Sequence, residues 1–191
     1  MSHRYPAIPL DGSSGLGSQF ESEVKKHHGN NPNFQYKDKD GAPIGPFAML
    51  SYTPELFGPM MAHGDAILNQ SGLSLLSREL AILAVLAVYE IPFVLYAHTR
   101  IALKAGLSDA QIALAIKGET PEGLEEGDRV VYVTALGLAK GSGPLDEEVW
   151  RTAEATLGKV GTARVAQVVG LYLYVGTFMR LGDVPAPTEG T

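Results

Sequence analysis

The stretch from Leu75 to Gly106 constrains the fold most, because it is the longest apolar run in the chain. Charged and polar residues interrupt it, so it holds no uninterrupted apolar segment of about 20 residues that could span a membrane. Pro92 also forbids one continuous helix, since its ring clashes with the carbonyl four residues back and it has no N–H. The run therefore predicts two core helices that meet near Glu90 and Ile91, with Pro92 opening the second helix and Gly106 ending it.

Two ionisable residues lie on the apolar faces of these predicted helices. Glu79 falls between leucine and isoleucine positions of the first helix, and His98 shares a stripe with Val94 and Ile101 on the second. A carboxylate buried among apolar side chains is costly unless it has a partner. If the helices form an antiparallel hairpin, Glu79 and His98 can meet. Such a pair either transfers protons or is a structural hydrogen bond, and Tyr96, near the start of the His98 helix, is a candidate hydrogen-bond donor.

The rest of the chain predicts an all-α protein of 191 residues. Residues 1–46 are rich in glycine, proline and asparagine, which favours an extended arm with a short helix at 18–27. A helical domain is expected over 47–187, followed by a tail at 188–191. Further helices are predicted at 53–68, 75–90, 92–105, 108–118, 128–140, 146–157 and 163–181.

Composition excludes several classes of function. The net charge is −6, which argues against a nucleic-acid partner. The chain has no cysteine, so thiolate metal sites and thiol redox chemistry are excluded. One carboxylate and one histidine are too few to predict a metal site, and no cofactor-binding motif is present, so no metal or cofactor is expected. The N-terminus lacks the apolar core of a signal peptide, which favours the cytoplasm.

Four segments, in this order, resemble the carboxymuconolactone decarboxylase / alkylhydroperoxidase D-like family, over about residues 45–187. They are GPFAMLSYTPELF, LSRELAILAVLAV, AHTRIALKAGLSDAQI and VVGLYLYVGTFMRLGDVPAP. The resemblance implies an all-helical bundle that assembles as a homo-oligomer, usually a trimer or hexamer. It also implies an active site that contains Glu79 and His98.

The sequence departs from the family at two positions. Peroxidase members carry a Cys-x-x-Cys motif before the histidine, but Ile91 and Val94 stand at those positions here. Decarboxylase members commonly carry an acidic-aromatic pair just before the histidine, where this chain has Val94 and Leu95. The resemblance therefore implies a more apolar pocket, to which we assign four residues: Ile91, Val94, Phe47 and Tyr52.

We expect an enzyme that performs cofactor-free acid/base chemistry on a small apolar organic acid, lactone or polyketide-like ring. Decarboxylation, isomerisation and elimination are all open. His98 is expected to be the acid/base, Glu79 its orienting partner and Tyr96 a donor. The alternative is a non-catalytic or ligand-binding member of the family, in which Ile91 and Val94 mark an inactive peroxidase site.

Overall fold

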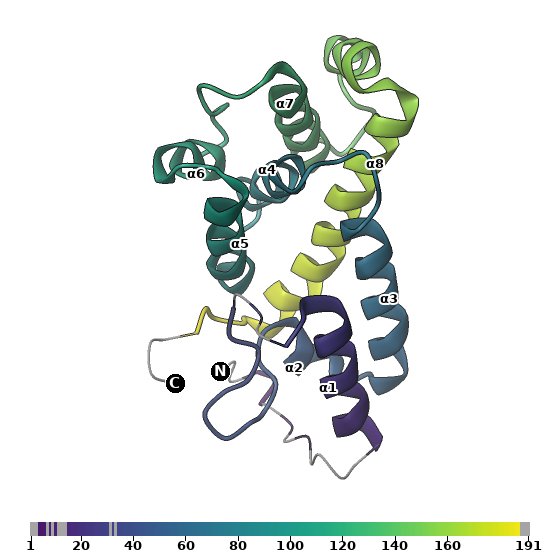
Figure 1. Ribbon diagram of the computed structural model, residues 1–191, viewed down its shortest axis with the longest axis vertical. Coiled ribbons are helices and arrows are strands. Elements are labelled where there is room, and N and C mark those ends of the chain that lie inside the picture. The colour runs from purple at the N-terminus through teal and green to yellow at the C-terminus, as the bar shows by residue number, and fades with distance from the viewer. Residues whose placement is uncertain are drawn as a thin grey trace. The chain divides into compact units, whose positions relative to one another are not determined.

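The computed structural model describes residues 4–6, 8, 10, 15–30, 32 and 34–187. Within these residues the regular structure is helical, and strand-like pairing is limited to one bridge between Lys37 and Pro43. The predicted tail at 188–191 lies outside the described residues. The helices, labelled in Figure 1, are α1 (Gly15–His28), α2 (Pro46–Leu50), the 3₁₀ helix η1 (Pro54–Leu56), α3 (Phe57–Leu68), α4 (Leu75–Leu86), α5 (Pro92–Ala105), α6 (Asp109–Ile116), α7 (Glu126–Lys140) and α8 (Glu147–Gly182).

The predicted all-α class is confirmed, and most helix boundaries lie close to the predicted ones. Pro92 opens α5 as expected, and Gly106 follows its end with a φ of 105°. Ser108 caps α6 and forms the capping box with Gln111 that the sequence indicates. α4 ends at Leu86 rather than near Glu90, because the residues before Pro92 form the turn that leads into α5.

The predicted helices at 146–157 and 163–181 are two parts of α8, which bends only at Gly158. Gly158 has a φ of 67°, a left-handed conformation that side chains with a Cβ rarely adopt. Helical geometry resumes directly after it, and the hydroxyl of Thr162 donates to the carbonyl oxygens of Gly158 and Lys159. The second part therefore begins earlier than predicted.

The chain divides into two compact units, and α3, α5 and α8 each contribute residues to both. The first unit comprises residues 1–66, 91–97 and 175–191, and the second comprises 67–90 and 98–174. Aromatic rings from α1, α2 and α3 form the core of the first unit, where the ring of Phe20 lies 5.7 Å from the rings of both Phe47 and Phe57.

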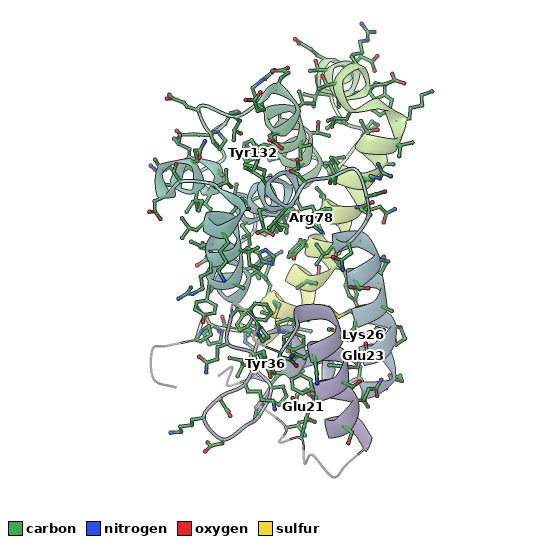
Figure 2. The ribbon with its side chains drawn as sticks, viewed as in Figure 1. Glu21, Glu23, Lys26, Tyr36, Arg78 and Tyr132 are labelled. Carbon is green, nitrogen blue, oxygen red and sulfur yellow. The ribbon has the colours of Figure 1, made fainter. Side chains whose placement is uncertain are left out.

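α4 forms the centre of the second unit and packs against α6 and α7 (Figure 1). Its residues 80–85 have no exposed surface. The hydroxyl of Ser77 donates to Asp128 and so ties α4 to α7. Tyr132 of α7, labelled in Figure 2, donates to the carbonyl oxygen of Ala115 at 2.7 Å. Burial and the negative charge of Glu119 raise the pKa of Tyr132 to about 12.

α8 is long and apolar enough to cross a membrane by length and composition alone. Half of its most apolar 18-residue window is nevertheless buried inside the protein, as is also usual for a core helix.

Candidate active site

Glu79 lies on the buried face of α4, in the second unit. Its side chain is 4% exposed, and the residues that follow it on the helix, Leu80 to Val85, are fully buried. A carboxylate in such surroundings needs a hydrogen-bond donor, because burying an unpartnered charge costs roughly several kcal/mol. The donor comes from α5.

His98, on α5 but within the second unit, is this donor. Its Nδ1 lies 2.8 Å from Oε2 of Glu79, and its side chain is 13% exposed. The two ionisable residues that the sequence places on adjacent apolar faces therefore do meet. Because an ionised carboxylate only accepts hydrogen bonds, we assign the Nδ1 proton to the neutral imidazole, which leaves Nε2 as an acceptor.

Tyr172 of α8 completes the arrangement. Its hydroxyl lies 2.8 Å from Nε2 of His98, and the two rings meet edge-on, with centroids 4.9 Å apart. With the tautomer assigned above, the Tyr172 hydroxyl donates to His98 and His98 donates to Glu79. Three residues from three helices, Tyr172, His98 and Glu79, thus form one continuous hydrogen-bond chain, which we call the relay.

Electrostatics keep the Tyr172 hydroxyl protonated. Burial raises the pKa of Tyr172 well above its ordinary value, and the negative charge of Glu79 raises it further, whereas the positive charge of Arg78 opposes both effects. Tyr172 is therefore a hydrogen-bond donor at neutral pH. It can accept a proton only if it passes its own proton on, and His98 is placed to take it.

The other predicted site residues belong to the first unit. The hydroxyl oxygen of Tyr96 accepts a hydrogen bond from the backbone N–H of Gln35 at 3.4 Å. Ile91 is buried and packs so closely on α8 that a Cβ at Gly176 would lie 2.5 Å from it. Val94 is buried as well.

Phe47 and Tyr52 lie in different surroundings within the first unit. Phe47 is part of the buried aromatic core, whereas Tyr52 is exposed and donates a hydrogen bond to the carbonyl oxygen of Pro6 at 2.6 Å. Glu79 and His98 are bonded to each other within the second unit. The assignment of a shared pocket stays a prediction.

The sequence alone does not set Tyr172 apart from Tyr89, Tyr96 and Tyr174, and core packing is the simpler interpretation of a tyrosine in an apolar helix. A signal that distinguishes it is periodicity. Tyr172 follows Val165 by seven residues and Val168 by four, and all three are buried, whereas Tyr174 is exposed. A tyrosine on the buried stripe of a helix needs a partner for its hydroxyl, and a buried histidine is such a partner.

A metal site finds no additional support in the part of the chain that the structure describes. No group of three or more histidine, aspartate or glutamate side chains is arranged there so that it could hold a metal ion. The relay offers one imidazole nitrogen and one carboxylate, and these are bonded to each other.

Comparisons with known proteins identify the family and the fold. The profile of the carboxymuconolactone decarboxylase family matches residues 54–126, which include Glu79 and His98. No curated protein matches the chain in sequence. The recognition made from the sequence is confirmed: residues 54–126 belong to the carboxymuconolactone decarboxylase family, in a chain with the alkylhydroperoxidase D-like fold.

Solved structures share this fold over nearly the whole chain. One is the alkylhydroperoxidase AhpD core of an uncharacterized peroxidase-related protein from Ralstonia eutropha JMP134, with a TM-score of 0.76 and 19% identity, covering 97% of this chain and 93% of that one. Another is a variant of the debrominase Bmp8 in complex with 2,3,4-tribromopyrrole, with a TM-score of 0.74 and 13% identity, covering 98% and 94%. The apo form of Bmp8 has a TM-score of 0.73 at the same identity.

Proposed function

We propose that the protein is a cofactor-free acid/base enzyme that acts on a small apolar organic acid, lactone or polyketide-like ring. The observation that carries this proposal is the relay, in which two 2.8 Å contacts join Tyr172, His98 and Glu79. The relay contains both a protonated donor and a base, so it can supply and accept protons with the protein's own side chains. Decarboxylation, isomerisation and elimination each need such a group.

The order of the hydrogen bonds suggests how a proton moves. Both ring nitrogens of His98 already have partners, so a substrate can exchange a proton with His98 through the Tyr172 oxygen without breaking the pair with Glu79. As a substrate C–H or O–H bond breaks, its proton goes to the Tyr172 oxygen and the Tyr172 proton goes to Nε2. Glu79 then stabilises the imidazolium through its hydrogen bond with Nδ1. The reverse sequence delivers a proton to the substrate.

Two further observations support this class of chemistry. Ile91 and Val94 replace the peroxidase cysteines, so a thiol mechanism has no nucleophile in this chain. The debrominase of the same fold was crystallised with a small halogenated pyrrole, which is consistent with a small ring as ligand for this architecture.

The test is turnover of a panel of small carboxylic acids, lactones and cyclic ketones by two variants. We expect His98→Gln and Tyr172→Phe each to lower kcat/KM by about 10²- to 10⁴-fold, the usual contribution of a positioned acid or base. His63→Gln, an exposed histidine on α3, is the matched control and should keep full activity. Both variants must keep the wild-type far-UV spectrum.

The outcome also separates the alternatives. Full activity in both variants would sink the role of the relay. If a wild-type protein that binds panel members turns none of them over, and the two variants only lose stability, the protein is the non-catalytic member. Tyr96→Phe tests the sequence-based assignment: a loss as large as that of Tyr172→Phe would make Tyr96 a site residue too.

A further inference from the structure

Arg78 is a partly buried cation without a partner. It precedes Glu79 on α4, and its Nε is buried with no hydrogen-bond acceptor. Within the part of the chain that the structure describes, its guanidinium forms no hydrogen bond and no ion pair. The carboxylate next to it in sequence, Glu79, is already bonded to His98. Arginine is rarely buried unless it is paired, because five N–H groups and a positive charge lose their water.

Arg78 directly precedes Glu79, the acidic member of the relay, on α4. Burial and the charge of Glu79 raise the pKa of the Tyr172 hydroxyl, and the positive charge of Arg78 opposes them. Figure 2 labels Arg78 beside α4. Glu79, the acidic member of the relay, is paired with His98.

We propose that Arg78 is the residue that binds the substrate's carboxylate, so that the natural substrate is a small carboxylic acid rather than a neutral lactone or ketone. This inference rests on the proposed function, since it names the substrate class of the same site. A guanidinium offers two parallel N–H donors that match the two oxygens of a carboxylate. Binding would supply the acceptor and the counter-charge that Arg78 lacks.

This assignment also narrows the reaction. A carboxylate held by a guanidinium is stabilised in its charged form, which opposes its own loss as carbon dioxide. Reaction at the carbon atom next to the carboxylate is favoured instead. When a C–H bond beside the carboxylate breaks, the proton goes to the Tyr172 oxygen as the Tyr172 proton goes to His98, and the electron pair stays on the substrate as an enolate. Arg78 stabilises that added charge, which favours isomerisation or elimination.

The experiment measures binding, so it does not depend on turnover. The probes are benzoate and benzamide, which have nearly the same shape and differ in charge, and calorimetry gives the Kd of each. We expect wild type to bind benzoate at least tenfold more tightly than benzamide. Arg78→Met should weaken benzoate binding by about 10- to 100-fold and leave benzamide unchanged. Arg78→Lys should fall between the two because it keeps the charge but loses the fork.

Arg151→Met is the matched control, since it removes the same charge from an exposed position on α8 and should leave both Kd values unchanged. The ring signals of His98 in ¹⁵N-histidine-labelled protein, identified by their loss in His98→Gln, should move when benzoate binds. Equal affinity for the two probes in wild type, or unchanged benzoate affinity in Arg78→Met, overturns the inference.

The two proposals can fail separately. If His98→Gln and Tyr172→Phe leave turnover intact while benzoate binding still depends on Arg78, the relay is wrong and the carboxylate site stands. If turnover depends on the relay but benzoate binding ignores Arg78, only the carboxylate site falls. Should Arg78→Met not fold, Arg78→Lys and the wild-type comparison of benzoate with benzamide decide.

Discussion

At the scale of single residues, two buried polar atoms without a partner have different explanations. One is Nε of Arg78, which borders the relay and which we assign to a ligand. The other is the hydroxyl of Thr134 on α7, a residue that is 2% exposed. Thr134 lines a pocket of about 310 Å³ together with apolar and polar side chains: Arg129, Val130, Val133, Asp146, Glu148, Val149 and Thr152. Its hydroxyl is nevertheless buried and forms no hydrogen bond with any of them. The hydroxyl of Thr134 should therefore cost stability.

We predict that Thr134→Val stabilises the protein. Valine has nearly the same shape and also branches at Cβ, so the change removes an unsatisfied hydroxyl and little else. The free energy of unfolding should rise by about 1 kcal/mol, the low end of the cost of a buried unpaired polar group. Urea denaturation measures the effect.

Thr162→Val is the control, and it should change the free energy of unfolding in the opposite direction. The hydroxyl of Thr162 is bonded to carbonyl oxygens at 2.9 and 3.2 Å, so its removal should lower the free energy of unfolding by about 1 kcal/mol. If Thr134→Val destabilises as much as Thr162→Val does, the Thr134 hydroxyl has a partner and the argument from its isolation fails.

The candidate site could be predicted from the sequence only in part, and single residues explain why. Glu79 and His98 are conspicuous because an ionisable group on an apolar stripe is unusual whatever surrounds it. Tyr172 is not conspicuous, because tyrosine is common in apolar helices and its hydroxyl usually reaches an edge. In the sequence, Arg78 has no distinguishing feature except that it precedes Glu79. That its guanidinium lacks a partner is a fact of three-dimensional packing, which one sequence does not contain.

At the scale of elements, the sequence predicts helices and breaks better than it predicts where a helix resumes. Pro92 and the Ser108–Gln111 capping box act within one helical turn, so the neighbouring residues are enough to predict their effect. Both features are present in the structure. The break in α8 at Gly158 is also local. The start of the next helical segment is not, because Val165 and Val168 are fully buried and their packing stabilises the turn before them.

We predict that the bend in α8 depends on the conformation of Gly158 and not on space around it. A Cβ added at Gly158 would have no neighbour within 4 Å, but the φ of 67° is strained for alanine. Gly158→Ala should therefore lower the free energy of unfolding by about 1–2 kcal/mol. Thermal denaturation followed by circular dichroism checks this.

Gly64→Ala, in α3, is the matched comparison. Its Cβ would also have no neighbour within 4 Å, but the backbone there is ordinary helix. Alanine should raise stability by about 0.5–1 kcal/mol because it reduces the entropy of the unfolded chain. Equal effects of the two changes would show that the left-handed geometry at Gly158 is not a constraint.

At the scale of the whole molecule, the surface of α8 bears on assembly. One side of this helix is buried and carries Val165, Val168 and Tyr172. On another side, Val160 is 63% exposed and Tyr174 is 46% exposed. These two residues lie fourteen positions apart, which places them on nearly the same face of a helix with 3.6 residues per turn. Between them the exposed positions are small or uncharged: Ala163, Ala166, Gln167 and Gly170. A face of this kind is more typical of an interface than of a solvated surface.

We therefore predict that the chain forms a homo-oligomer in which this face of α8 is covered by another copy. Light scattering after size exclusion, at micromolar concentration, should give a multiple of the single-chain mass, with a trimer or hexamer expected from the family. Val160→Lys and Tyr174→Lys each place a charge on the face, and burying an unpaired charge at an interface costs several kcal/mol, roughly. Both should shift the protein to the monomer while its helical spectrum stays unchanged.

Glu122→Gln adds the same positive increment of charge at an exposed loop position and should leave the mass of the oligomer unchanged. A wild-type protein that is already monomeric at these concentrations would contradict the prediction. An oligomer that both lysines leave intact would place the interface elsewhere on the molecule.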